Sequence, residues 1–297
     1  MSDEARPPRE VVVVVNRRSR HTAHALGPLH AALREHGLTV LEFHLAQTST
    51  ELRAHVKRAA KAGVETVIVG GGDGTMAHAV DALAYRKTRL GVVPLGTGNS
   101  FAQSLGVPRG DVAAAIALIA RGKHARVDLG RVNGTYFANF ATIGLSSEIA
   151  GATPTAVKSI AGPLAYLVAA IRPLLTHRAF RAQIRWPRGK LTITTQDVIV
   201  ANGRYFGSSP VADDATLTDA TLHLFTTDDR TRIGALRTYL AFGMHEQGKL
   251  RGAHTIATPK LTIVAKPRQM ISIDGSLLEK TPARIRVAPR ALRVYIP

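Results

Sequence analysis

The sequence predicts an α/β protein of two domains: an N-terminal doubly wound, mostly parallel sheet, then a C-terminal antiparallel β-sandwich with inserted helices. Short apolar strands alternate with longer segments of helical periodicity over the first 125 residues, which is typical of a doubly wound sheet. From about Arg126 onward, short β-rich segments are separated by Gly, Pro or Asp, which favours two packed antiparallel sheets. We therefore place the domains at 1–127 and 128–297, and the last strand could return to the first domain.

The first domain contains four predicted strands and four predicted helices. The strands are Val11–Val15, Thr39–His44, Val64–Val69 and Leu90–Pro94, and the helices are Ala23–Glu35, Glu51–Ala62, Met76–Ala84 and Val112–Ala120. Ligands of such a sheet bind at the carboxyl ends of its strands. Two glycine-rich segments, Gly70–Gly74 and Gly96–Gly98, follow strands at that edge, so we expect the site there.

The second domain consists mainly of short predicted strands. They are Gly134–Phe140, Ala182–Trp186, Leu191–Ala201, Ala220–Thr226, Lys260–Ala265, Gln269–Ile273, Arg284–Val287 and Ala291–Ile296. Two predicted helices, Gly162–Leu175 and Ile233–Phe242, interrupt them. The longest uncharged apolar run, Ile160–Ile171, is shorter than the roughly 20 residues that cross a bilayer. We therefore expect no membrane span.

Charge and cysteine content restrict the partners and the compartment. The 297 residues include 39 Lys and Arg but 21 Asp and Glu, a net charge of +18, which favours polyanions such as nucleic acid or an anionic membrane surface. Only 5% of the residues are aromatic and the basic residues are scattered along the chain, which disfavours binding of single-stranded nucleic acid. The absence of cysteine excludes disulfides and thiol catalysis, and it fits a reducing compartment.

The segment Gly70-Gly71-Gly72-Asp73-Gly74-Thr75 is the most informative in the chain. Glycines at the end of a buried strand allow backbone N–H groups to approach a phosphate, and the N-terminus of the following helix adds a positive potential. Asp73 would repel a phosphate unless a metal ion or a proton in transit lies between them. Walker A is absent, and Thr75 stands where a dinucleotide fingerprint requires glycine.

Three further segments are candidates for chemistry. Pro94–Ser100 offers a second flexible backbone with a hydroxyl and an amide, so two loops could clamp a nucleotide. Asp274-Gly275 ends a predicted strand and is, by itself, a common hairpin turn. Asp213, Asp214 and Asp219 form a short acidic cluster, for which a metal site and a solvated loop are equally plausible.

These motifs, taken in order, resemble the diacylglycerol kinase catalytic-domain family, which is related to sphingosine kinases and NAD kinases. The best resemblance is to its bacterial soluble lipid kinase branch, and it covers nearly the whole chain. The segments that carry it are Asn16, Thr48 with Ala54, Gly71–Thr75, Pro94–Asn99 with Phe101-Ala102, Asp128–Gly130, Gly162–Tyr166, Asp274-Gly275 with Pro282, and Val294–Pro297.

The resemblance implies a lipid kinase that uses ATP and Mg²⁺. The residues implied at the nucleotide are Asn16, Thr48, Gly71, Gly72, Asp73, Gly74, Thr75, Thr97 and Asn99. Asp73 would engage the magnesium of Mg-ATP, and Asp274 would be the general base that takes a proton from the lipid hydroxyl. A structural metal is implied at the side chain of Asp219 and the carbonyls of Thr216 and Thr221.

The chain also departs from the family pattern. The first motif reads Asn16–Arg20 without its usual proline and glycine, and His78 replaces a common glutamate. The glycine after Asp219 is Ala220, and the glutamate of the late Asp-Gly-Glu motif is Ser276. If that glutamate were the true base, the chain would have lost it.

We therefore expect a kinase that phosphorylates diacylglycerol or a similar long-chain lipid. We expect it in the cytoplasm, peripheral at the inner face of an anionic membrane and without a nucleic-acid partner; a homodimer is left open. Ser276 motivates one alternative, a catalytically impaired lipid-binding or regulatory protein on the same scaffold. NAD kinase is a second alternative, disfavoured because no Asn-Glu pair occurs in the chain.

Overall fold

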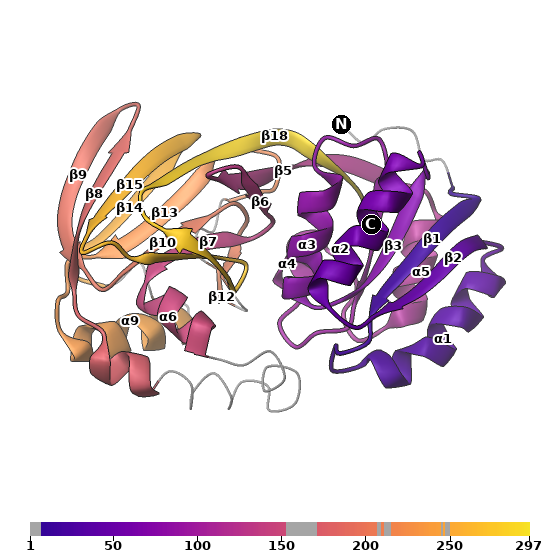
Figure 1. Ribbon diagram of the computed structural model, residues 1–297, viewed down its shortest axis with the longest axis horizontal. Helices are drawn as coiled ribbons and strands as arrows, with labels where there is room; N and C mark the ends of the chain where they lie inside the picture. Colours follow the sequence, from indigo (N-terminus) through magenta and orange to yellow (C-terminus); the bar gives the residue numbers. More distant parts are fainter. Residues whose placement is uncertain (1–6, 153–170, 207–208, 211–214, 245, 247–249) are drawn as a thin grey trace. The chain divides into compact units, whose positions relative to one another are not determined.

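The computed structural model describes residues 7–152, 171–206, 209–210, 215–244, 246 and 250–297 (Figure 1). The chain divides into two compact units, each with its own hydrophobic core. Unit 1 is Met1–Leu129 together with Pro289–Pro297, and unit 2 is Gly130–Ala288. The predicted fold class is confirmed: unit 1 is built on a parallel sheet, and unit 2 is an antiparallel sandwich.

The sheet of unit 1 has the order β2-β1-β3-β4, followed by the end of β18. Its strands are β1 (Glu10–Asn16), β2 (Thr39–Ala46), β3 (Thr66–Gly71) and β4 (Arg89–Pro94), all mutually parallel. Val294 of β18 pairs with Leu90 of β4, also in parallel. The order of the strands reverses between β1 and β3, and ligands of doubly wound sheets bind at such a reversal.

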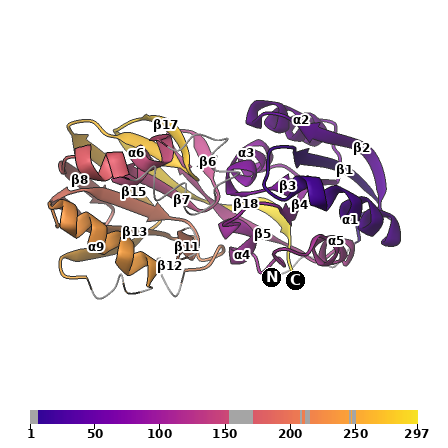
Figure 2. The same ribbon diagram turned by 90° about the horizontal axis from the view of Figure 1, so that it is seen from below.

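Helices cover both faces of this sheet (Figure 2). They are α1 (Thr22–Glu35), α2 (Ser49–Lys61), α3 (Asp73–Leu83), α4 (Ser100–Ser104) and α5 (Val112–Ala120). Helix α1 packs beside α5, and α2 packs beside α3. Every side chain of Val11–Val15 is buried. This follows from the two helix layers, because a parallel sheet between them has no solvent-exposed face.

Unit 2 contains two packed sheets. One sheet has the order β14-β13-β10-β7-β16-β17. The other, which we call the outer sheet, has the order β18-β15-β8-β9. The strands that follow β4 along the chain are β5 (His124–Val132), β6 (Thr135–Phe137), β7 (Phe140–Gly144), β8 (Phe180–Trp186), β9 (Gly189–Thr195), β10 (Asp197–Ala201), β11 (Tyr205–Phe206), β12 (Ser209–Pro210), β13 (Leu222–Thr227), β14 (Ala253–Thr258), β15 (Lys260–Lys266), β16 (Met270–Ile273), β17 (Ser276–Lys280) and β18 (Ala283–Tyr295). Strands β5 and β18 each have one end in unit 1, and β11 and β12 form a separate two-stranded sheet. Apolar residues from the two sheets form one cluster that includes Ile143 and Leu224 on one side and Ile184 and Ile263 on the other.

The six-stranded sheet carries helices on its other face. They are α6 (Leu145–Ala152), α9 (Arg232–Gly243) and a helical stretch at 171–176. Phe242 of α9 packs edge-on against Phe225, and Leu145, Ile149 and Ala235 form a second small cluster. Within the described residues, no helix is both long and apolar enough to cross a membrane. The predicted helix Gly162–Leu175, the run Ile160–Ile171 and the acids Asp213 and Asp214 lie wholly or mainly outside those residues.

Several predicted boundaries are wrong. The segment Leu191–Ala201 is two strands in different sheets, because the chain turns at Gln196, whose side-chain amide donates to the carbonyl of Arg230. Conversely, Arg284–Val287 and Ala291–Ile296 belong to one strand, β18, which pairs with β15 at its start and with β4 near its end. The predicted strand Gly134–Phe140 is likewise two strands, because β6 ends at Phe137 and β7 begins at Phe140. Strands β5, β11, β12, β14 and β17, the rest of β7, and helices α4 and α6 were not predicted, because their sequences are too short or too polar to show a clear period.

Candidate functional site

The first glycine-rich segment joins β3 directly to α3. Strand β3 ends at Gly71, and α3 begins at Asp73, three residues before the predicted start of the helix. The amides of Thr75 and Met76 donate to the carbonyl of Gly72 at 2.9 and 3.0 Å. The positive end of an eleven-residue helix therefore lies at the carboxyl edge of the sheet, beside the reversal between β1 and β3.

Asn16 ties the end of β1 to this segment. Its Nδ2 donates to Oγ1 of Thr75 at 2.8 Å, and its Oδ1 accepts from the amide of Arg18 at 2.9 Å. Its carbonyl accepts from the Thr22 hydroxyl at 2.8 Å. The side chain of Asn16 thus links the loop after β1 with the first glycine-rich segment, after β3. Arg17 and Arg18, which follow Asn16, are exposed.

The two glycine-rich loops touch through their backbones. A Cβ on Gly96 would lie 2.5 Å from Cα of Gly72, and a Cβ on Gly72 would lie 3.1 Å from Cα of Gly96. Real Cβ atoms essentially never approach a backbone carbon to 2.5 Å, so the loops can meet this closely only because residue 96 is glycine. The structure therefore brings together the two loops that the sequence predicted would act as a pair.

Asp73 links the first loop to the start of α4. Its carboxylate accepts from the amide of Phe101 at 3.1 Å and from the hydroxyl of Ser100 at 3.3 Å. Burial raises the pKa of Asp73, and the amides of Ser100 and Phe101 partly offset that effect. Asp73 thus stabilises the N-terminus of α4. This contact explains an acid among glycines without a metal, and its role toward magnesium stays a prediction.

Asn99 folds the second loop upon itself. Its backbone is left-handed, with φ of 52°, and its side chain accepts from the amide of Gly96 at 3.0 Å and donates to the carbonyl of Gly96 at 2.8 Å. The amide that the sequence assigned to the nucleotide is therefore engaged within the loop. Thr97 and Gly74, by contrast, are exposed.

Thr48 has a clear structural role at the end of β2. Its Oγ1 accepts from the amide of Glu51 at 3.1 Å, and the Glu51 carboxylate accepts from the amide of Gln47 at 2.7 Å. These bonds cap α2 in the manner of a capping box. The hydrogen bonds of the described residues connect Thr48 with α2 and not with the glycine-rich loops.

A cleft of about 1030 Å³ adjoins the second loop within unit 1. Its walls come from the start of α1, the Pro94–Thr97 segment and the turn before α5. The residues that line it include His21, His24, Gly96, Thr97, Arg109 and Asp111. It is large enough to hold a drug-sized or nucleoside ligand.

Asp274 lies in the turn between β16 and β17. Asp274 and Gly275 have φ of 46° and 79°, as a two-residue hairpin turn requires. The buried carboxylate accepts from the amides of Ala138, Asn139 and Phe140 at 2.7, 2.9 and 3.0 Å. Asp274 is therefore a turn residue and also a rigidly held carboxylate. Ser276 begins β17 opposite Ile273 and is half-buried.

The predicted metal residues gather around one carboxylate. Asp219 accepts from the amides of Thr216 and Thr221 at 2.9 and 2.8 Å, so both oxygens of the one predicted side-chain ligand are already hydrogen-bonded. Ala220 adopts φ of 54°, a conformation that favours the family's glycine. The described residues contain no cluster of three His, Cys, Asp or Glu able to bind a metal. Hard cations take about six oxygen ligands, so this set fits them poorly and we derive no step from a metal here.

Sequence patterns gave no sign of a buried polar cluster under α9. Asp197 at the start of β10 accepts from the amide of Ser146 at 3.2 Å and from the hydroxyl of Tyr239 at 3.1 Å, and the Ser146 hydroxyl also donates to it. Burial raises the pKa of Asp197 to about 6. Within the described part of the chain its Oδ1 has no partner. The cluster joins α6, β10 and α9.

Comparisons with known proteins agree with this architecture. The pattern of the diacylglycerol kinase catalytic domain matches residues 10–132, and that of the YegS C-terminal NAD kinase beta sandwich-like domain matches residues 141–296. A relative from Yersinia enterocolitica named "Probable lipid kinase YegS-like" is 30% identical, over 89% of this chain and 90% of that one. A relative of the same name from Pseudomonas aeruginosa is 31% identical, over 90% and 88%.

Solved structures show the same fold. The crystal structure of a diacylglycerol kinase from Bacillus anthracis strain Sterne aligns with a TM-score of 0.72 and 23% identity, and the alignment covers 97% of each chain. Both domain patterns and relatives matched over nearly their whole length lead to one conclusion. The chain belongs to the diacylglycerol kinase catalytic-domain family, in its branch of YegS-like lipid kinases.

Proposed function

We propose that the protein transfers the γ-phosphoryl group of Mg-ATP to the hydroxyl of diacylglycerol or a similar long-chain lipid. The observation that carries this proposal is the backbone contact of Gly72 with Gly96, beside the N-terminus of α3 and a cleft of about 1030 Å³. Phosphoryl transfer depends mainly on positioning and charge neutralisation, which such loops supply. Membership of a lipid kinase family supports a lipid acceptor.

Within unit 1, the polar backbone beside Gly72, Gly74 and Thr97 would contact the phosphates, and the cleft would receive the nucleoside. Gly74 and Thr97 are exposed, so a ligand can reach them. Asn16 and Asn99 act by holding the loops in place. Magnesium, when bound with ATP, would neutralise phosphate charge, and Asp73, which joins the two glycine-rich loops, would engage it through water.

Asp274 is the proposed general base. In the transfer, the lipid oxygen bonds to the γ-phosphorus while the bond to the β–γ bridging oxygen breaks; the hydroxyl proton passes to Asp274 and ADP leaves. Three amide donors fix the orientation of the carboxylate, so Asp274 would present its oxygens to the lipid hydroxyl in one geometry. We further propose that the enzyme works in the cytoplasm at the inner face of an anionic membrane.

Labelled ATP and a lipid extract test the proposal. We expect Mg-dependent transfer of the γ-phosphate to a lipid product, and its loss in Asp274→Asn. The variant places an NH₂ group against backbone amides, so its unfolding must be measured beside wild type. Asp229→Asn is a matched control, because Asp229 also accepts a backbone amide, from Thr231 at 2.9 Å, outside the proposed site. Transfer that persists in a folded Asp274→Asn would contradict the proposed base.

Ser276 supports the second candidate, a lipid-binding protein with little turnover. It occupies the first position of β17, directly after the Asp274-Gly275 turn, where the Asp-Gly-Glu motif implied by the resemblance has glutamate. Ser276→Glu separates the candidates. A silent wild type that gains transfer in Ser276→Glu would favour the binding protein, whereas an active wild type would exclude it.

A further inference from the structure

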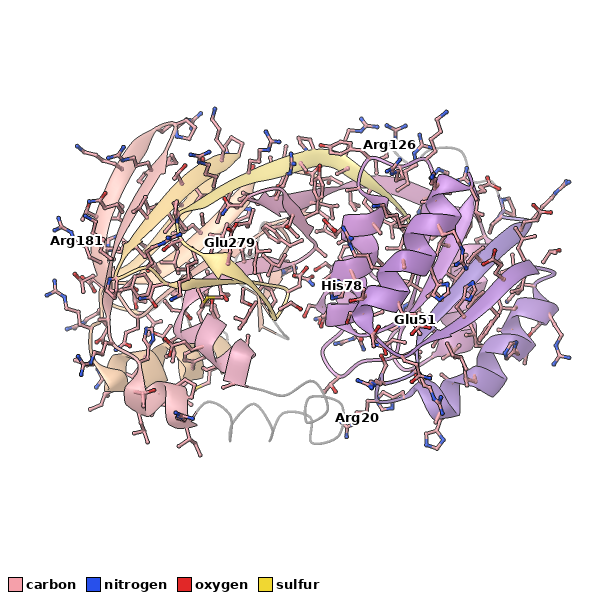
Figure 3. All side chains as sticks on the ribbon, in the orientation of Figure 1. Arg20, Glu51, His78, Arg126, Arg181 and Glu279 are labelled. Carbon is pink, nitrogen blue, oxygen red and sulfur yellow. The ribbon has the colours of Figure 1, made fainter. Side chains whose placement is uncertain are left out.

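On the solvent side of the outer sheet of unit 2, every charged side chain of the strands is positive. Along β8, β9, β15 and the first part of β18, alternate residues enter the core, and the others face outward. The outward cations, which we name the cationic face, are Arg181, Arg185, Lys190, Lys260, Lys266, Arg284 and Arg286. The other outward residues are Gln183, Thr192, Thr194, Thr262 and Val264, so these strands place no acid among them. Figure 3 labels Arg181, which points away from the sheet.

The strand register sets like charges directly opposite one another. Lys260 of β15 is opposite Arg286 of β18, and Lys266 is opposite Arg181 of β8. Arg185 of β8 is opposite Lys190 of β9. Directly opposed side chains lie about 5 Å apart at Cβ, and like charges there destabilise a sheet. Three such pairs on one face are a cost to folding that local sequence preference does not explain.

Acidic side chains do not relieve this repulsion. All seven cations of the face are exposed, and none takes part in an ion pair of the described residues. Elsewhere in the chain arginines do find acids, as Arg53 does with Asp81 at 2.6 Å. Departures from local rules without an internal gain are expected where a surface serves a partner.

We propose that the cationic face is the surface by which the protein docks on an anionic lipid bilayer. This inference deepens the proposed function, on which it rests, because a kinase with a membrane-embedded acceptor must reach that membrane. Phosphate headgroups would neutralise the opposed cations, and the threonines between them can donate to phosphate oxygens. The outward positions include no aromatic side chain, so the face lacks the stacking surfaces of single-strand nucleic-acid binders.

The test compares two variants that each remove four positive charges. The face variant replaces Arg181, Arg185, Arg284 and Arg286 by Gln, and the control replaces Arg34, Lys57, Lys61 and Arg121 of unit 1 by Gln. The control residues are also exposed and outside the described ion pairs. Binding is measured to phosphatidylcholine vesicles with and without phosphatidylglycerol, at low and high salt.

We expect wild type to bind only the anionic vesicles, and binding to weaken with salt. The face variant should bind several hundredfold more weakly, since each of the four cations near an anionic surface contributes about fivefold. The control should change binding by less than about threefold. Removal of opposed like charges should also raise the melting temperature of the face variant at low salt, which shows that lost binding is not lost folding.

Three results would overturn the inference. Equal weakening in both variants would assign binding to the overall field of the protein. Tighter binding of RNA than of anionic vesicles at the same salt would assign the face to nucleic acid. Unchanged binding of the face variant, together with loss in Leu236→Ser/Leu240→Ser, would transfer docking to the exposed apolar side of α9.

The proposed function is tested separately from this surface. Transfer to a lipid dispersed in neutral detergent should be retained in the face variant, because no bilayer has to be reached. Vesicle binding without transfer to any lipid would refute the kinase proposal and leave the docking surface standing. Transfer without face-dependent binding would do the reverse.

Discussion

Asp73 occupies the first position of α3, and its carboxylate accepts from both the amide of Phe101 and the hydroxyl of Ser100. The sequence alone presented it as an acid that repels phosphate. The structure gives it a mechanical role, because it joins the first glycine-rich loop to the helix after the second. Asn99 shows the same reassignment, from ligand contact to loop closure. The role of Asp73 depends on a contact across 27 residues, which leaves no local pattern, whereas Asn99 closes its own loop onto Gly96.

Asp73→Asn separates the mechanical role from the ionic one. Asparagine keeps an oxygen that accepts from Phe101, and it removes a charge whose burial raises the pKa of Asp73. The free energy of unfolding should therefore change by less than about 1 kcal/mol. If Asp73 engages magnesium as proposed, Mg-dependent transfer should fall at least about tenfold, because the carboxylate loses its charge. Asp229→Asn, which removes a charge outside the proposed site, is the control; equal transfer in both variants would exclude an ionic role of Asp73.

Asp197 makes stability depend on pH. Its pKa is raised from 3.8 to about 6 by burial, so the folded chain holds a proton that the unfolded chain releases. That stabilisation is complete below about pH 3.8 and is lost as pH rises through about 6. Between pH 5 and 7, unfolding measurements on wild type should show a loss of about 1 kcal/mol. Asp197→Asn should lack this loss; an identical pH dependence would place the titration elsewhere.

At the scale of elements, the strands and helices of unit 1 followed from period and burial. The run Val11–Val15 and the helices α1 and α2 were predictable because one repeated signal covers each of them. The start of α3 was not, because glycines hide a helix that tertiary contacts impose. In unit 2 the break at Gln196 was equally hidden, since β-branched residues lie on both sides of it, as they would in a single strand.

The contact of the two loops predicts unequal effects of alanine at two glycines. Gly96→Ala would place Cβ 2.5 Å from Cα of Gly72, so the loops must separate. We expect a loss of about 1–3 kcal/mol in stability, as for other overpacked sites, and weaker ATP binding. A Cβ at Gly74 meets nothing within 4 Å. In the absence of ligand, Gly74→Ala should therefore be as stable as wild type. Calorimetric unfolding distinguishes them; similar stability of both variants would contradict the contact.

At the scale of the whole molecule, the structure adds most to the sequence in the distribution of positive charge. Along the chain the basic residues are scattered, and a net charge of +18 said only that a polyanion is favoured. The register of β8, β9, β15 and β18 gathers seven of them on one face, because alternate positions share a side only when the sheet forms. Motifs, in turn, predicted the family and the two loops, but they could not say which residues hold the loops and which remain open to a ligand.

The central claim is that the chain is a lipid kinase, and one partition measurement tests it most directly. Purified protein is incubated with γ-labelled ATP, Mg²⁺, diacylglycerol and NAD together, and label is then counted in the organic and aqueous phases. We predict label in the organic phase, abolished when EDTA removes Mg²⁺ and strongly reduced in Gly96→Ala. Label recovered in phosphorylated NAD would contradict the lipid kinase. So would the absence of label from NAD, from diacylglycerol and from every other lipid tried as acceptor.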